Sequence, residues 1–294
     1  MRKTGYIAIV GRPNVGKSTL LNAILGEKVA IVSSKPQTTR NRIIGIHTEG
    51  ENQFVFLDTP GIFRPRNSLG SYMVKTANST MQDADAVILV ADAGKPVSEV
   101  EENVIKYVEK ASLPCVLVLN KTDLYNREII AQTISMYASK HNFDAVVPVC
   151  AKNGKGVGEV LDECGRFLSE SDFFFPTDIV TDQSERQVAA EIIREKLLRT
   201  LNKEVPHGIA VVIEEFKDEG SLISIRAEIY CEKASHKGII VGKHGEELKR
   251  VGSYARADLE AIFGTKVYLN LWVKVKENWR DSQRVITDFG YKGD

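Results

Sequence analysis

The feature that most constrains the fold is a glycine-containing loop near the amino terminus, residues 11–19, which reads GRPNVGKST. An apolar run at residues 6–10 precedes the loop, and a helical pattern at residues 19–25 follows it. A strand, this spacing of glycines and lysine, and a helix together form a phosphate-binding P-loop. Backbone N–H groups of such a loop face the β-phosphate, and the positive end of the helix dipole adds to them. We therefore expect Lys17 to reach the β- and γ-phosphates and Ser18 to hold Mg²⁺.

The length and composition fit a soluble protein of two domains. A chain of 294 residues with 43% hydrophobic and 27% charged residues is long enough for two cores. The formal net charge is zero, so any nucleic-acid site must be a local patch. The four cysteines have no metal-ligand spacing and are expected to be reduced. No secretory signal and no membrane-length apolar run is present, which favours an intracellular location.

The segment at residues 28–42 is polar, contains one proline and lacks periodicity, so we expect a loop. A long loop beside a nucleotide site is a candidate switch that the γ-phosphate orders. Thr39, or failing that Thr38, is expected to give Mg²⁺ a second hydroxyl. The alternative is a solvated loop whose threonines contact nothing.

A hairpin is expected next, because two β-rich runs at residues 43–48 and 53–57 flank the turn signal EGEN. The second run ends in the sequence DTPG, residues 58–61. Asp58, at the carboxyl end of a buried strand, can hold Mg²⁺ through water, and the Gly61 N–H can contact the γ-phosphate.

Position 62 is isoleucine, not the glutamine that orients the attacking water in Ras-like enzymes. Hydrolysis is therefore expected to be slow unaided, and to use another group, a bound cation or a partner. Asn14 stands where related enzymes with the sequence NVGKS coordinate a monovalent cation. A K⁺ ion there could supply positive charge, and the alternative is that Asn14 only shapes the loop.

Two further motifs predict a guanine site. The sequence NKTD at residues 120–123 follows an apolar run at 115–119. The Asp123 carboxylate can accept hydrogen bonds from N1–H and the exocyclic amino group of guanine, a pair of donors that adenine lacks. The sequence CAK at residues 150–152 follows the run at 145–149, and such a turn places backbone N–H groups against guanine O6.

The ordered set GRPNVGKS, TT, DTPG, NKTD and CAK resembles the translation-factor-related small GTPases, and within them the Era-like branch. The resemblance implies a doubly wound, mostly parallel α/β P-loop domain that binds GTP or GDP with Mg²⁺. The catalytic residues are expected to be Lys17, Ser18, Thr39 and Gly61, and the metal ligands Ser18, Thr39 and Asp58. The expected nucleotide-binding residues are Gly11, Arg12, Pro13, Asn14, Val15, Gly16, Lys17, Ser18, Thr19, Asp58, Thr59, Pro60, Gly61, Ile62, Asn120, Lys121, Thr122, Asp123, Cys150, Ala151 and Lys152.

The second half of the chain carries a different order of elements. Helical patterns, β-rich runs and a final alternating run predict the order αββααβ over residues 185–200, 207–216, 222–231, 236–241, 246–263 and 266–275. A GxxG loop at residues 242–245 lies between the central helices, and the whole resembles a type II KH domain. Small residues in that loop let the backbone lie against four single-stranded nucleotides, and the alternative is a structural turn. The expected RNA-binding residues are Lys237, Gly242, Lys243, His244, Gly245, Lys249, Arg250 and Arg256.

A GTPase of this branch with one carboxyl-terminal KH domain resembles the Era family over nearly the whole chain. We expect a GTP-binding domain at residues 1–175, a linker at 176–184 and a KH domain with an extension at 185–294. The triplet FFF of residues 173–175, directly before the linker, is expected to serve as an inter-domain anchor. Val241, where isoleucine is usual, and His244, where glycine is usual, depart from the family pattern.

The resemblance implies binding to the 3′ end of small-subunit (16S) rRNA and a role in 30S subunit assembly. It also implies a cytoplasmic monomer with loose peripheral contact to the inner membrane. Two alternatives stay open. One is a related GTPase with a different client, although such proteins carry further appended domains. The other is a KH-linked GTPase that acts mainly as a nucleotide-gated RNA-binding chaperone with another RNA client.

Overall fold

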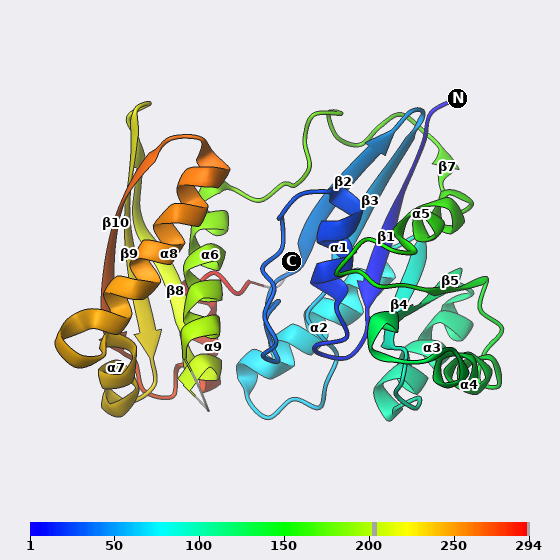
Figure 1. Cartoon of the computed structure of the whole chain (residues 1–294), viewed down its shortest axis with the longest axis horizontal. Coiled ribbons are helices and arrows are strands. Elements are labelled where there is room, and N and C mark those ends of the chain that lie inside the picture. The colour runs from blue at the N-terminus through cyan, green and yellow to red at the C-terminus, as the bar shows by residue number, and fades with distance from the viewer. Residues whose placement is uncertain (202–204, 293–294) are drawn as a thin grey trace. The chain divides into compact units, whose positions relative to one another are not determined.

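The structure is a computed structural model that describes residues 1–201 and 205–292. The chain divides into two compact units, one of residues 1–65 with 73–182, the other of residues 66–72 with 183–294 (Figure 1). Each unit has its own sheet, and each is described by itself below.

The first unit, which is described throughout, is built on a seven-stranded sheet with the order β2-β3-β1-β4-β5-β6, and β7 pairs with the start of β1. The β1–β3, β1–β4, β4–β5 and β5–β6 pairs are parallel, whereas β2 pairs antiparallel with β3 as the expected hairpin. The strands are β1 (Lys3–Val10), β2 (Ile43–Glu49), β3 (Asn52–Asp58), β4 (Ala86–Asp92), β5 (Cys115–Asn120), β6 (Ala145–Pro148) and β7 (Ser169–Glu170).

Helices cover both faces of this sheet, which is why its central strands are apolar on both sides. Side chains of α1 and α5 pack into the core on one face, and side chains of α2, α3 and α4 pack into the core on the other. The helices are α1 (Lys17–Leu25), α2 (Ser68–Gln82), α3 (Glu99–Ala111), α4 (Arg127–Ala138) and α5 (Val157–Gly165). The doubly wound α/β fold expected from the sequence is therefore confirmed for this unit.

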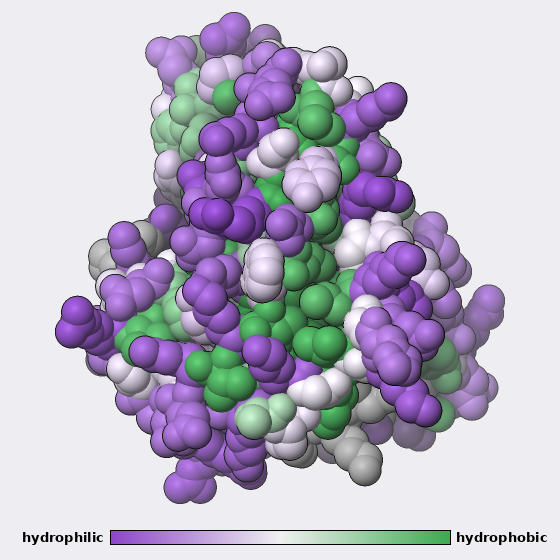
Figure 2. Space-filling model, turned by 90° about the vertical axis from the view of Figure 1, so that its left-hand side faces the viewer, coloured by the Kyte–Doolittle hydropathy of each residue, from purple (hydrophilic) through white to green (hydrophobic). Residues whose placement is uncertain are grey.

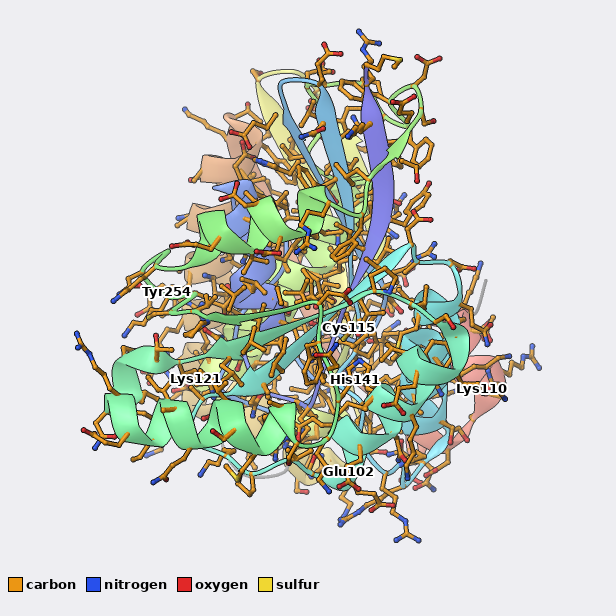
Figure 3. The ribbon with its side chains drawn as sticks, turned by 90° about the vertical axis from the view of Figure 1, so that its right-hand side faces the viewer. Glu102, Lys110, Cys115, Lys121, His141 and Tyr254 are labelled. Atoms are coloured by element: carbon orange, nitrogen blue, oxygen red, sulfur yellow. The ribbon has the colours of Figure 1, made fainter. Side chains whose placement is uncertain are left out.

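Ion pairs on the surface join α3 to the end of α4. Lys140 lies 2.9 Å from Glu102, and His141 lies 3.0 Å from Glu109. Figure 3 marks Glu102 and His141 on this side of the molecule. Three of these four groups are exposed, so the two pairs stabilise the fold little.

The structure differs from the sequence-based expectations in three places within this unit. Helix α2 was not expected from the sequence. The sequence predicts a last helix of this unit at residues 156–169, but α5 ends at Gly165, because the chain turns there and pairs with β1 as β7. The phenylalanine triplet packs on strands of the first unit, where Phe174 stacks on Tyr6 with ring centroids 5.1 Å apart and the Phe175 carbonyl accepts a hydrogen bond from Gln53.

The second unit contains a three-stranded sheet with the order β10-β9-β8. Strand β8 pairs antiparallel with β9, and β10 pairs parallel with β9. Helices α6 and α8 pack on one face of the sheet. The elements are α6 (Glu185–Thr200), β8 (Ala210–Asp218), β9 (Leu222–Cys231), α7 (Ala234–Val241), α8 (Glu246–Phe263) and β10 (Lys266–Val275). The order αββααβ is thus confirmed.

Beyond β10 the chain folds back as two short elements, the 3₁₀ helix η4 (Trp279–Asp281) and α9 (Gln283–Asp288). The Trp279 ring is fully buried, and its Nε1–H donates a hydrogen bond to the Gly208 carbonyl. Within residues 1–201 and 205–292, no helix is both long and apolar enough to cross a membrane.

Candidate functional site

The polar motifs of the first unit meet because parallel strands end at the same edge of the sheet. Strand β1 leads into the glycine loop, and Asp58 at the end of β3 lies opposite Ile9 of β1. On the other side of β1, Asp92 at the end of β4 lies opposite Asn120 at the end of β5. From β1 the sheet extends through β3 on one side and through β4 on the other. Doubly wound folds bind nucleotides at the strand where the order changes sides in this way.

Two glycines of the loop could not be replaced without moving the backbone. A Cβ on Gly11, where φ is +148°, would lie 2.3 Å from the Val90 carbonyl oxygen. A Cβ on Gly16, where φ is +102°, would lie 2.2 Å from Nδ2 of Asn120. Gly16 is also the N-cap of α1 and has no side chain to satisfy the first backbone N–H groups of the helix. These backbone N–H groups can therefore bind an anion.

Lys17 lies beneath the loop with 6% of its surface exposed. Its Nζ donates hydrogen bonds to the Gly11 and Arg12 carbonyls, at 3.3 and 3.1 Å. Burial lowers the pKa of Lys17 to about 8, against the opposing attraction of the Asp58 carboxylate. A cation held in a dry site and loosely paired with carbonyls has the character of a phosphate-binding lysine.

The three expected metal ligands lie together. The Ser18 hydroxyl donates to Oδ2 of Asp58 at 2.7 Å and lies 2.8 Å from Oγ1 of Thr39. Thr39 Oγ1 also donates to the same carboxylate oxygen at 3.3 Å. Thr38 instead donates its hydroxyl to the Lys35 carbonyl, so the structure selects Thr39 between the two threonines.

The other oxygen of Asp58, Oδ1, is buried and has no hydrogen-bond partner in the structure. Burial raises the pKa of this carboxyl, while Lys17 and the hydrogen bonds from Ser18 and Thr39 lower it. A buried carboxylate oxygen without a partner, next to two hydroxyls, fits the all-oxygen coordination that Mg²⁺ prefers. The residues present therefore suit the metal that the sequence motifs imply.

A cavity opens beside these groups, and its lining includes Asn14, Lys17, Ser18, Thr39 and Gly61. At Gly61 a Cβ would lie 2.7 Å from the backbone nitrogen of Pro13, so the chain after β3 can approach the glycine loop only without a side chain.

Around this cavity the remaining loop residues hold the two motifs together. Thr59 donates its hydroxyl to the Ile9 carbonyl at 2.9 Å, and the Ile62 N–H donates to the Gly11 carbonyl at 3.1 Å. The Asn14 side chain reaches the loop at residues 28–42, where its Nδ2 donates to the Ser34 carbonyl at 2.9 Å. The same two loop segments also contain Val15, Thr19 and Pro60.

At the other end of the site, Asn120 ties the motifs to one another. Its Nδ2 donates to the Val15 carbonyl at 2.9 Å, and its Oδ1 accepts the Ala151 N–H at 3.0 Å. The N–H that the sequence assigns to guanine O6 is thus engaged by Asn120 in this structure. Lys152 follows in the same turn.

The two residues expected to contact the base also have defined partners. The Cys150 thiol donates to Oδ1 of Asp123 at 3.3 Å, which orients that carboxylate. Lys121, at the carboxyl end of β5 (Figure 3), places its Nζ 3.0 Å from the Asp92 carboxylate. The Thr122 N–H donates to the Val149 carbonyl.

Sequence reasoning missed Glu101, the partner of Arg12. Glu101 has no exposed surface, and its Oε1 accepts a hydrogen bond from Nε of Arg12 at 2.8 Å. Its other oxygen accepts the Ser98 N–H and hydroxyl in a capping box at the start of α3. The spacing Ser98-x-x-Glu101 was the available signal, but nothing in it indicates that the carboxylate is buried against the glycine loop.

The GxxG loop of the second unit lies between α7 and α8, as expected, with Lys243–Gly245 forming the 3₁₀ helix η3. A Cβ on Gly242, where φ is +75°, would lie 2.6 Å from Cγ of Glu247, whereas a Cβ on Gly245 would meet no atom within 4 Å. His244 also has a positive φ, +50°. The backbone around Gly245 is therefore open to a ligand.

Basic side chains surround this loop and are exposed. They are Lys237, Lys243, His244, Lys249, Arg250 and Arg256, and Arg250 lies 2.6 Å from Glu247. Ile239 of α7 is 49% exposed beside them. The side of the second unit that lies on the left in Figure 1 carries a band of hydrophobic surface framed by hydrophilic residues (Figure 2). Apolar surface beside positive charge suits nucleotide bases attached to phosphates.

The fold and site define a P-loop GTPase domain followed by a carboxyl-terminal KH domain. Residues 6–121 match the family described as 50S ribosome-binding GTPase, and residues 204–280 match the KH domain family. GTPase Era of Clostridium kluyveri is 47% identical over 293 residues, which cover 99% of this chain and 100% of the relative. GTPase Era of Clostridioides difficile is 46% identical over 294 residues and covers 99% of both chains. The chain belongs to the Era family of GTPases.

Two solved structures agree with this assignment. A crystal structure of Era in complex with MgGDPNP and nucleotides 1506–1542 of 16S ribosomal RNA has a TM-score of 0.96 at 39% identity and covers the whole of both chains. A point variant of Aquifex aeolicus Era bound to GDP and AlF4⁻ has a TM-score of 0.95 at 39% identity, over 99% of this chain and 100% of that one.

Proposed function

We propose that this protein hydrolyses GTP to GDP and phosphate as a molecular switch and binds the 3′ end of small-subunit rRNA through its KH domain, in assembly of the 30S subunit. The observation that carries the proposal is the cluster of Ser18, Thr39 and Asp58 beside the desolvated Lys17. Ser18, Thr39 and Lys17 line one cavity, and the Asp58 carboxylate that Ser18 and Thr39 contact has a buried oxygen without a hydrogen-bond partner.

In this proposal the glycine loop and Lys17 bind the β- and γ-phosphates, and the Gly61 N–H contacts the γ-phosphate. Ser18 and Thr39 coordinate Mg²⁺ directly, and Asp58 holds it through water. The metal neutralises charge that develops between the β- and γ-phosphates. Asp123 reads the guanine edge, with Asn120 and Lys121 bracing the base and Cys150 orienting the carboxylate.

The attacking water needs help from outside residue 62, because the isoleucine side chain offers it no hydrogen bond. We propose that a K⁺ ion near Asn14 supplies positive charge at the phosphates. The support is the sequence NVGKS at residues 14–18, on which the resemblance rests. In this structure Nδ2–H of Asn14 donates to the Ser34 carbonyl, so the amide must turn to bring its Oδ1 to the ion. Turnover in K⁺ should exceed turnover in Na⁺ at equal ionic strength, and equal rates contradict the K⁺ site.

For the RNA, the support is the open backbone at Gly245, the basic side chains around it and the relative that was crystallised with 16S rRNA nucleotides. We assign residues 1–175 to the GTP-binding domain, 176–184 to the linker and 185–294 to the KH domain; of the last range, residues 202–204 and 293–294 lie outside the described part. We place the protein in the cytoplasm as a monomer, with loose contact to the inner membrane.

One observation favours a second candidate, a nucleotide-gated RNA chaperone with negligible turnover. The isoleucine side chain at position 62 offers the attacking water no hydrogen bond. Multiple-turnover phosphate release separates the two, because a chaperone of this kind binds GTP and releases no phosphate beyond one equivalent.

The decisive experiment measures GTP turnover with and without a single-stranded RNA that matches the 3′ end of 16S rRNA. We expect RNA to raise turnover. Gly245→Asp should abolish the rise, because its carboxylate repels the RNA backbone. Gly245→Asn is the matched control: it has the same size and tolerates the positive φ, but it carries no charge. RNA that binds neither the native chain nor the Asn variant refutes the RNA client.

A further inference from the structure

The sheet of the second unit has one face that its helices do not cover. Helices α6 and α8 pack on the other face, and Leu271 points toward α8, because a Cβ on Gly252 of that helix would lie 3.4 Å from its Cδ1. Side chains alternate along a strand. Asn270 and Trp272, the neighbours of Leu271, therefore belong to the open face.

Two large aromatic side chains of β10 stand on this open face with most of their surface exposed. Tyr268 is 59% exposed and Trp272 is 58% exposed, whereas Val267 and Val273 beside them are 4% and 7% exposed. Four residues of strand separate the two rings by about 13 Å. Aromatic rings exposed together in this way mark a contact surface rather than an ordinary strand.

The residues around the rings are polar and, on balance, basic. The register of the sheet places basic side chains beside the rings, and acidic ones are fewer. Four are basic (Lys217, Arg226, Lys266 and Lys274) and two are acidic (Glu215 and Glu228), which leaves an excess of two positive charges in a chain whose formal net charge is zero. A surface of this charge favours an anionic partner.

One end of the same face is already in contact with a ring from the chain itself. Phe289, directly after α9, lies with its ring centroid 4.4 Å from that of Tyr230, and Tyr230 shares the open face because it pairs with Lys274. The carboxyl-terminal segment therefore covers the Tyr230 end. The Tyr268 and Trp272 end remains exposed, with Asn270 between the rings.

We propose that this face is a second contact for single-stranded RNA, in which bases stack on Tyr268 and Trp272. The phosphates meet the basic side chains of the three strands, and the Asn270 amide, which both donates and accepts, meets a base edge. The inference rests on the proposed RNA-binding function and adds a surface distinct from the GxxG loop. A protein partner fits less well, because polar and charged groups separate the rings.

The two tryptophans of the chain make the test specific. Trp272 is 58% exposed and Trp279 is fully buried, so stacking of a base on the open face changes the emission of Trp272 alone. The probe is a labelled single strand of about 12 nucleotides from the 3′ end of 16S rRNA, three times the four nucleotides that a GxxG loop clamps. Its binding to the full chain is followed by anisotropy and, separately, by tryptophan emission.

The variants separate a ring from mere apolar surface. Tyr268→Leu with Trp272→Leu keeps apolar side chains but removes the rings, and should weaken RNA binding by about tenfold or more, since stacking on each ring contributes a factor of about 5 to 150. Tyr268→Phe with Trp272→Phe keeps the rings and should bind like the native chain. In the native chain, RNA should quench the exposed tryptophan.

Each outcome supports or overturns the second RNA contact. RNA that binds the native chain without changing Trp272 emission, or that binds the leucine pair as tightly, overturns the second contact and leaves the GxxG site standing. Equal weakening in the leucine and phenylalanine pairs overturns stacking. RNA that produces no anisotropy change with the native chain overturns the RNA-binding function and this inference together. The urea midpoint of each variant, followed by the emission of the buried Trp279, verifies that the second unit has folded.

Discussion

The P-loop and the GxxG loop offer a comparison of two glycine loops in one chain, each leading into a helix whose N-cap is a glycine without a side-chain cap. Gly16 caps α1 and Gly245 caps α8, and both have positive φ. Around Gly16 the protein leaves no space, since a Cβ would lie 2.2 Å from Asn120, whereas around Gly245 it leaves open space. The first loop is held by the protein itself, and the second is left for a ligand to fill.

That difference has an energetic consequence. The groups beneath the P-loop are desolvated and bonded to one another, so each change there leaves a buried polar partner unsatisfied and costs about 1 to 3 kcal/mol. The basic groups around the GxxG loop are exposed and screened, so individual changes there affect the fold little. The predictions below test this contrast, from the largest expected effect to the smallest.

Replacing the buried lysine should give the largest effect. Lys17→Met keeps the length of the side chain and removes its charge. Two charge-assisted hydrogen bonds to phosphate contribute about 1.5 to 3 kcal/mol each, so we expect GTP affinity to fall by about 100-fold to 10,000-fold. Equilibrium titration with a fluorescent GTP analogue measures this loss.

Lys110→Met is the matched control, because Lys110 is exposed in the last turn of α3 (Figure 3) and lies outside the cavity lining. Its GTP affinity should equal that of the native chain. A loss of less than tenfold in Lys17→Met contradicts the assignment of Lys17 to the phosphates.

The two glycines of the GxxG loop should differ in stability when each is changed to alanine. Gly242 has φ +75° and ψ 179°, a conformation nearly restricted to glycine, and a Cβ there would lie 2.9 Å from the backbone nitrogen of Glu247. We expect Gly242→Ala to destabilise the second unit by about 3 kcal/mol. Gly245→Ala, in the left-handed helical region with open space around it, should cost only about 1 kcal/mol.

Urea unfolding followed by tryptophan emission measures both changes, because Trp272 and Trp279 lie in the second unit and the chain has two tryptophans. Equal midpoints for the two variants would show that the clash at Gly242 is relieved at no cost, and the contrast within the loop would be lost.

The low pKa of Lys17 predicts a pH dependence of GTP binding. In the nucleotide-free protein burial lowers this pKa to about 8, whereas bound phosphates favour the charged form. Binding therefore takes up a proton above pH 8, and Kd should rise about tenfold per pH unit there. Over the same window the unfolded chain binds more protons than the folded one, so nucleotide-free stability should rise with pH up to about 10.5.

Calorimetric titration of GTP at several pH values measures this slope. Lys17→Arg supplies the control, since its guanidinium stays charged and its Kd should not share the rise just above pH 8. Any rise that both proteins show at higher pH reports ionisation of the guanine N1–H that Asp123 accepts. A native Kd that stays constant from pH 8 to 10 contradicts the assignment of the proton to Lys17.

The motifs of the nucleotide site could be located from the sequence because each one combines a fixed spacing with a strand end. Thr39 was preferred over Thr38, but the spacing alone could not exclude Thr38, since the choice depends on which hydroxyl the loop turns toward Asp58. The pairing of Arg12 with the buried Glu101 was hidden, because the same spacing at the start of α3 fits an exposed capping box.

In the second unit the helices and strands agreed with the patterns, whereas in the first unit helix α2 was the main element missed. Its sequence, SLGSYMVKTANSTMQ, contains glycine, serine and threonine, which weaken helix propensity. It forms because Leu69, Met73, Ala77 and Met81 lie on one buried side of the helix. The spacing of four residues between these side chains was the available signal, and tertiary packing of that side overrides the weak local preference.

The thiol beside the guanine carboxylate should give the smallest effect. Cys150→Ala removes the hydrogen bond to Oδ1 of Asp123 and frees the carboxylate to rotate. A neutral hydrogen bond contributes about 0.5 to 1.5 kcal/mol, so GTP and GDP affinity should each fall by about 2-fold to 10-fold. Cys150→Ser retains a donor at this position and should restore both. If the alanine and serine variants bind GTP equally, the Cys150 thiol only fills space. The hydrogen bonds of Asn120 are then the buried contacts that position the guanine-binding loops.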